Sequence, residues 1–118
     1  MEKIEVMLDE HDFTVELNDN KTVDSLLRHL PMDITVGEDG GQRYYGPTPT
    51  PLPVDGAPAT SSPRRGDLYY SKFWNAGAIF YGNGKTAPFV LVHLGDVQED
   101  GRLLNLSKYQ YRVTIKPA

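Results

Sequence analysis

Apolar and polar residues alternate with a period of two near the start of the chain. In Lys3–Leu8 every second residue is apolar, and Phe13–Leu17 repeats the pattern. Successive side chains of a strand point to opposite faces, so this alternation predicts two strands that each have one apolar face. The polar stretch Asp9–Asp12 favours a turn between them. The sequence therefore predicts an antiparallel hairpin with one face in the core.

The period then changes to that of a helix. Apolar residues recur at positions i, i+3, i+4 and i+7, namely Val23, Leu26, Leu27 and Leu30. Thr22 is a good N-cap residue, and Asp24 would lie in the first turn, where the helix dipole favours negative charge. Pro31 disfavours the α conformation at the residue before it. One short helix is expected over about residues 22–30, covering one opening or face of a sheet.

A second hairpin is predicted directly after this helix. Residues 32–36 return to the two-residue period, and residues 42–45 form the next strand-like run. Between them, Glu38–Gly41 ends in two glycines, which readily adopt the positive φ values of tight turns. These features predict strand, turn and strand in succession.

The second half of the chain is rich in strand signals. Four further strands are predicted, at Asp67–Ser71, Asn75–Gly82, Phe89–Leu94 and Tyr109–Lys116. Asn83-Gly84 and Asp100-Gly101 are turn signals, and Leu103–Leu106 is interpreted as a short helical turn or an irregular segment. Phe89–Leu94 is almost entirely apolar, as is typical of a buried central strand. About eight strands with one helix predict a mainly β fold, closed into a small barrel that leaves no free edges.

Residues 46–63 contain six of the nine prolines of the chain. Proline fixes φ and lacks the N–H that a sheet requires, so this segment is neither a helix nor a central strand. We expect an extended excursion over the surface. A linker between domains is the alternative. The residues after the segment complete the same strand pattern, and the chain is expected to be one domain, 1–118.

Composition narrows the classes of partner. The chain has 118 residues, a net charge of −4 and no cysteine. A negative charge disfavours nucleic acids and anionic membranes, which bind basic surfaces. The lack of cysteine excludes disulfides and thiolate metal ligands. The charged N-terminus differs from a signal peptide, and no apolar run is long enough to cross a membrane. A soluble cytoplasmic protein is the expectation.

The order of motifs is similar to that of the small bacterial and archaeal cyclophilin-like domains, most of which have no assigned function. The resemblance covers most of the chain and includes LNDNKTVDSLLRHLP and GQRYYG. Its most specific part lies in the second half: Gly66-Asp67-Leu68, Tyr70, Ala78, Phe80-Tyr81-Gly82, Val90 and Leu94-Gly95-Asp96-Val97. The resemblance implies a small closed β-barrel related to cyclophilins, with one short helix.

The chain departs from the cyclophilins that act as prolyl isomerases. Those enzymes line their peptide groove with a Phe-His-Arg segment and a glutamine-rich segment, and neither is present here. Arg43 is the arginine that precedes aromatic residues on a predicted strand, but its context differs. The catalytic arginine of the family therefore has no matching position in this chain.

Aromatic residues are concentrated in Tyr69–Gly82, which holds six of the chain's twelve. Large rings beside the small residues Ala76–Ala78 form either a tightly packed core layer or the wall of a ligand pocket. A buried tyrosine hydroxyl also needs a hydrogen-bond partner, which a ligand can supply. The residues predicted to contact a ligand are Tyr44, Tyr45, Tyr70, Phe73, Trp74 and Phe80.

Candidate catalytic groups are few. His93, at the end of an apolar run, can act as an acid or base near neutral pH, and Tyr70 is a second candidate. Asp96 could orient His93 across a turn at Gly95. Asp67 is interpreted as fixing the turn after Gly66 through its side chain. Neither paired histidines nor clustered carboxylates occur within one element, so no metal site and no cofactor are expected.

The first functional hypothesis is a barrel that binds a small apolar molecule or peptide without prolyl isomerase activity. The alternative is a cofactor-independent isomerase or cyclase that orients an apolar natural product inside the barrel, with the proline-rich segment as a lid. Prolyl isomerisation, by analogy with the family, is the second alternative. Protein interaction through the proline-rich segment is also open.

Overall fold

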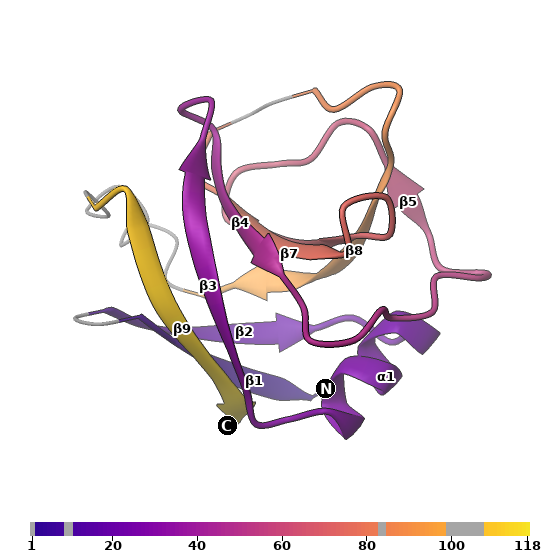
Figure 1. Ribbon diagram of the computed structural model, residues 1–118. Helices are drawn as coiled ribbons and strands as arrows, with labels where there is room; N and C mark the ends of the chain where they lie inside the picture. The colour runs from indigo at the N-terminus through magenta and orange to yellow at the C-terminus, as the bar shows by residue number, and fades with distance from the viewer. Residues whose placement is uncertain (1, 9–10, 83–84, 99–107) are drawn as a thin grey trace.

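The chain folds into strands that curl around one apolar interior, as a computed structural model shows (Figure 1). The structure describes residues 2–8, 11–82, 85–98 and 108–118. The predicted turns at Asn83-Gly84 and Asp100-Gly101 and the segment Leu103–Leu106 lie outside these residues.

The first hairpin and the second are both confirmed. β1 (Lys3–Leu8) pairs antiparallel with β2 (His11–Leu17), and β3 (Met32–Asp39) pairs antiparallel with β4 (Arg43–Pro47). Both glycines of the second turn, at positions 40 and 41, have positive φ, as a tight turn requires.

The other strands complete a closed barrel. They are β5 (Ala59–Thr60), β6 (Asp67–Ser71), β7 (Ala76–Phe80), β8 (Leu91–Val97) and β9 (Gln110–Pro117). The order in the sheet is β2-β1-β9-β3-β4-β7-β6-β8, and β2 also pairs with β8, which closes an eight-stranded antiparallel barrel. β5 is an additional strand that pairs with the start of β8. The predicted mainly β barrel with one short helix is confirmed.

The alternating apolar rows of the strands fill the interior. Inward-facing side chains from all sides of the barrel form one buried cluster, including Val6, Val15, Val36, Leu68, Leu94 and Val113. Because the period is two, Tyr69 lies on the outer face between the inward-facing Leu68 and Tyr70. In the described residues, no helix has the length and apolar character needed to cross a bilayer.

α1 (Lys21–Arg28) lies close to the predicted place, but its cap differs. The N-cap is Asn20, whose side chain accepts a hydrogen bond of 2.9 Å from the N–H of Val23. Thr22 is buried instead, and its hydroxyl donates to the carbonyl of Pro53 at 2.6 Å. The prediction of Thr22 as N-cap was therefore wrong, since a buried acceptor on another segment holds its hydroxyl.

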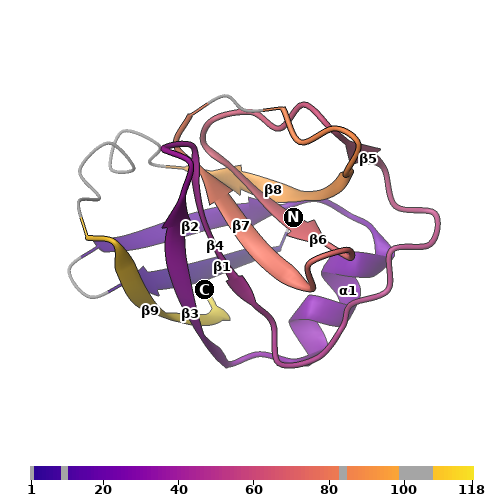
Figure 2. The same cartoon turned by 45° about the horizontal axis from the view of Figure 1, so that its top comes forward.

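The proline-rich segment is anchored at the end of the barrel that α1 covers (Figures 1 and 2). Leu52 is only 4% exposed and belongs to the interior cluster. Its N–H donates to the hydroxyl of Tyr70 at 3.0 Å, and that hydroxyl donates to Asn75 at 2.8 Å. The proline-rich segment thus contributes the side chain of Leu52 to the apolar interior of the barrel.

β8 differs most from its prediction. It begins at Leu91 and runs through Gly95 to Val97, so Phe89 and the exposed Val90 precede it. The expected turn at Gly95 is wrong, because Gly95 pairs with Leu17 on one side and Leu68 on the other. β8 pairs with β6 on one side and with β2 on the other.

Candidate functional site

The six aromatic residues predicted to contact a ligand divide between the two faces of the barrel wall. Tyr44 and Tyr70 belong to the interior cluster, and the hydroxyl of Tyr44 donates to the carbonyl of Lys108 at 2.7 Å. The other four lie outside this cluster, namely Tyr45, Phe73, Trp74 and Phe80. The structure therefore does not bring the six together in one pocket.

The barrel interior is almost full. Its apolar cavity, which Tyr44, Tyr70 and Gly77 help to line, has a volume of about 40 Å³. Pockets for small ligands have volumes of roughly 300–1,000 Å³, so this space is far too small for such a ligand. The hydroxyl of Tyr70 is already bonded to Leu52 and Asn75. Neither the cavity nor Tyr70 offers a free polar group to a ligand inside the barrel.

A second apolar cluster covers the outer face of β6, β7 and β8. Its members are Tyr69, Ala78, Phe80 and Leu91, with Trp74 packed against them. Arg43 lies over the rings of Trp74 and Phe80, at 5.4 and 5.6 Å from their centres, and forms an ion pair of 2.6 Å with Asp39. The protein's own side chains therefore fill the outer space beside Ala78.

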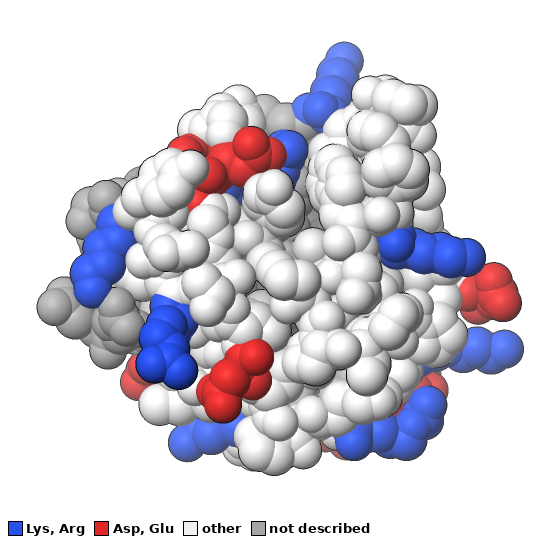
Figure 3. All heavy atoms as spheres, in the orientation of Figure 1, with Lys and Arg blue, Asp and Glu red and all other residues white. Residues whose placement is uncertain are grey.

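Beyond this cluster the surface forms a hollow of about 540 Å³. We call it the Phe73 hollow, and its lining residues are Val54, Ala57, Ala59, Lys72, Phe73, Pro88, Phe89, Val90 and Val92. Phe73 is 70% exposed, and its ring centre lies 4.4 Å from that of Phe89, with the two ring planes tilted by 38°. The ring centre of Trp74 lies 5.5 Å from that of Phe89. The surface over β5, at the upper right of Figure 3, is largely uncharged. An exposed apolar surface of this kind is typical of an interaction site.

The turn between β6 and β7 holds Lys72 and Phe73 in place at this hollow. The hydroxyl of the buried Ser71 accepts from the N–H of Trp74 at 3.0 Å, and the N–H of Asn75 donates to the carbonyl of Lys72 at 3.3 Å. Asn75 has a φ of 48°, a conformation that asparagine tolerates better than most residues. The two exposed side chains therefore project from a fixed backbone.

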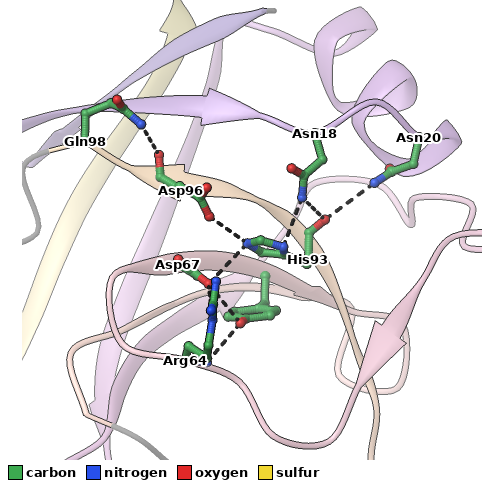
Figure 4. A network of polar contacts seen from close by, with 8 residues as sticks. Asn18, Asn20, Arg64, Asp67, His93, Asp96 and Gln98 are labelled. Carbon is green, nitrogen blue, oxygen red and sulfur yellow. Dashed lines mark hydrogen bonds and ion pairs between the residues drawn. The ribbon is translucent and has the colours of Figure 1, made fainter.

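His93 lies at the centre of a separate polar network (Figure 4). Its Nε2 is 3.0 Å from Asp96 Oδ1 and 3.3 Å from Asp67 Oδ2, and its Nδ1 is 3.0 Å from Asn18 Nδ2. The predicted neighbourhood of His93 and Asp96 is present. Asp67 is 8% exposed in its side chain and also contacts the Tyr69 hydroxyl at 3.3 Å, so its interpretation as a turn residue missed its main contacts.

A β-bulge brings this network together. Asp67 is opposite Asp96 and Leu68 is opposite Gly95, but Tyr69 is opposite His93, so the register shifts by one residue. The extra residue places His93 and Asp96, three positions apart, on the same outer face. In a regular strand, residues three apart would point to opposite faces. Strict alternation therefore could not reveal this site. The expected contact of His93 with Asp96 was placed across a turn at Gly95, where the structure has a bulged strand.

Asn18 determines which nitrogen of the neutral His93 ring carries the hydrogen. Its amide nitrogen donates to the His93 carbonyl at 3.1 Å, which only an N–H can do, and the same nitrogen faces Nδ1. Nδ1 is therefore the acceptor, and the proton of the neutral ring is on Nε2, facing the two carboxylates. Both ring nitrogens are engaged. In this arrangement His93 connects the loop before α1 to the barrel wall.

The three residues Asp67, His93 and Asp96 also form a group that could hold a metal ion, since their ligand atoms lie within 4.8 Å of one another. The sequence search missed this group because its members come from two strands. Metal binding through Nε2 would need the proton on Nδ1, where it would face the Asn18 amide hydrogens. The hydrogen bonding around the ring therefore favours the polar network over a metal site.

Burial raises the pKa of Asp67, and the charge of Asp96 adds to this effect, although His93 and Arg64 act in the opposite direction. A carboxyl with a raised folded-state pKa contributes stability below its ordinary value of 3.8, and this contribution is lost as the pH rises through the folded-state pKa. We therefore expect the free energy of unfolding of Asp67→Asn to rise relative to that of the native chain as the pH increases from about 3 to about 7. Urea unfolding of both proteins across this range measures the difference. A difference that changes in the opposite direction would contradict a raised pKa of Asp67.

The fold and these surfaces define a class of protein, a small closed antiparallel β-barrel with a filled interior and an aromatic outer wall. The model of the cyclophilin-like family matches residues 6–116, and the chain belongs to this family. The expected resemblance is thereby confirmed.

Among solved structures, the chain is similar to the solution structure of the hypothetical protein AF2241 from Archaeoglobus fulgidus. The TM-score is 0.72 at 18% sequence identity, with 99% of this chain and 95% of that chain covered. At this identity the likeness concerns the fold alone. The search of curated proteins found no match.

Proposed function

We propose that the protein binds a small apolar molecule in the Phe73 hollow. The observation that carries the proposal is the contrast in volume between the two candidate spaces. The hollow measures about 540 Å³, and the interior cavity about 40 Å³. Pockets for small ligands have volumes of roughly 300–1,000 Å³ and are lined mainly by apolar and aromatic side chains. One of the six residues expected to contact a ligand, Phe73, lines this hollow.

Three aromatic residues supply the recognition surface. Phe73 and Phe89 stack on each other and face the hollow, and Trp74 contacts Phe89 from the side of the buried outer cluster. Covering the exposed ring of Phe73 would remove apolar area from water, which stabilises the complex by about 25 cal/mol for each Å². Because the turn that carries Phe73 is held by Ser71 and Asn75, little conformational entropy is lost on binding.

The two enzymatic alternatives lack a comparable observation. A natural product positioned inside the barrel would need far more room than about 40 Å³. For prolyl isomerisation, Arg43 is the arginine on the aromatic outer face. Its guanidinium is paired with Asp39 and stacked over two rings, and its side chain is only 16% exposed. Neither arrangement presents a reactive group to a substrate.

Fluorescence of Trp74, the single tryptophan, tests the proposal. The neutral apolar dye N-phenyl-1-naphthylamine is titrated into the protein, and energy transfer from Trp74 to the dye is recorded. We expect saturable binding that Phe73→Ser weakens about tenfold, which corresponds to the loss of part of one buried phenylalanine ring.

Tyr109 offers a matched control for this titration. It is 76% exposed, similar to Phe73, but it does not line the hollow. Tyr109→Ser should leave dye binding unchanged. If the dye does not bind at all, or if both substitutions weaken binding equally, the hollow is not a ligand site and the proposal fails.

A further inference from the structure

The Phe73 hollow combines an apolar lining with one charged group. Eight of its nine described lining residues are apolar, and Lys72 alone is charged. Lys72 is adjacent to Phe73 in the turn between β6 and β7, so both side chains extend from the same fixed piece of backbone. A ligand lying on Phe73 therefore has a cation within its reach.

We propose that the natural ligand is a small apolar molecule that carries a carboxylate, with its apolar body on Phe73 and Phe89 and its carboxylate at Lys72. This inference rests on the proposed function and names the chemical class that the same site selects. Charge complementarity supports this choice of ligand. A carboxylate can pair with Lys72, whereas an ammonium group at this position would be repelled by it.

The two parts of the site have different roles. The apolar lining provides most of the affinity, because burial of apolar area is the larger contribution in a hollow of this composition. The ion pair at the exposed Lys72 is partly solvated and contributes modestly, so it orients the ligand and sets the preference between head groups. The preference should weaken as salt is added, because exposed charges are screened.

Two other clusters among the described residues differ from this site. The group Asp67, His93 and Asp96 has its hydrogen-bonding partners within the protein, and the Asn18 amide opposes a metal at Nε2. A second hollow beside α1 is lined by three apolar residues, by Asn18 and by Glu2, Asp19 and Asp24, an acidic cluster without a further sign of a ligand. The Phe73 hollow is the place where shape, apolar surface and a single charge coincide.

Three probes of equal chain length separate the roles of body and head group. Decanoate, decanol and decylammonium are each used below the concentration at which they form micelles, and each is competed against N-phenyl-1-naphthylamine. In the native chain decanoate should bind about two- to fivefold more tightly than decanol, as an exposed ion pair allows, and decylammonium should bind most weakly. Lys72→Gln should abolish the advantage of decanoate and leave decanol unchanged.

A reversal of charge completes the test. Lys72→Glu should favour decylammonium over decanoate, whereas Lys116→Gln on β9, a lysine paired with Glu5, should leave the order of the native chain. If decanoate keeps its advantage in Lys72→Gln, or has none in the native chain, the inference about the carboxylate is overturned, while dye and decanol binding still support the hollow. If none of the probes binds, the proposed function fails as well.

Discussion

Replacing Gly95 by alanine is expected to lower the free energy of unfolding by about 3 kcal/mol, at the upper end of the usual loss for overpacking. A Cβ atom at this position would lie 2.3 Å from the carbonyl oxygen of Glu16 and 3.0 Å from the Cα of Leu17. Both atoms belong to the backbone of β2, which cannot move aside as a flexible side chain can. β2 and β8 share only three residue pairs, and these close the barrel.

Gly77→Ala is the matched control for Gly95→Ala. Gly77 is also in a strand, but a Cβ there would meet no atom within 4 Å. We expect Gly77→Ala to be neutral or to stabilise by about 0.4–1 kcal/mol, because alanine restricts the unfolded chain. Urea unfolding followed by circular dichroism measures both variants. Equal unfolding midpoints for the two would show that the close approach of β2 and β8 is absent.

The closure of the barrel and the His93 network depend on the same part of β8. Gly95 allows β2 to approach, and the bulge beside it turns His93 and Asp96 to one face. Asn18, at the end of β2, then reaches both Nδ1 and the carbonyl of His93. The network therefore connects the strand that closes the barrel to the outer wall.

Much of the barrel could be predicted because its strands obey one simple rule. In β1 and β9, every second residue is apolar, and those residues do face the interior. The separation of Tyr70 from Tyr69, and of Ile79 from Phe80, follows from the same period of two. Local alternation is enough here because each strand has one face in the core.

The candidate site could not be predicted to the same extent, because it depends on where alternation fails. One extra residue in β8 aligns His93 with Asp96, and no local pattern marks its position. The sequence left open whether the aromatic rings form a packed core layer or the wall of a pocket, so it could not separate the interior Tyr44 and Tyr70 from the four outer residues. That choice depends on packing between distant segments, above all on the position of Leu52.

Leu52→Ala is expected to destabilise the protein by about 2–5 kcal/mol, although Leu52 lies in a segment with proline on both sides. The side chain is buried in the interior cluster and lines the small cavity, so its truncation enlarges an empty apolar space that the barrel cannot easily close. Val54→Ala, in the same segment but only partly buried, should cause a clearly smaller loss. Urea unfolding of both variants provides the comparison.

Tyr70→Phe tests whether the position of the proline-rich segment also depends on the hydrogen bond between the N–H of Leu52 and the Tyr70 hydroxyl. The Tyr70 hydroxyl accepts from the N–H of Leu52, so the substitution leaves a buried donor unpaired, a loss of about 1–2 kcal/mol. The double variant with Leu52→Ala should lose less stability than the sum of the two single losses. The reason is that displacement of the proline-rich segment in Leu52→Ala already breaks this hydrogen bond. A lid that opens freely would give small and additive losses instead. Strong coupling would mean that the proline-rich segment is a structural part of the barrel and not a lid.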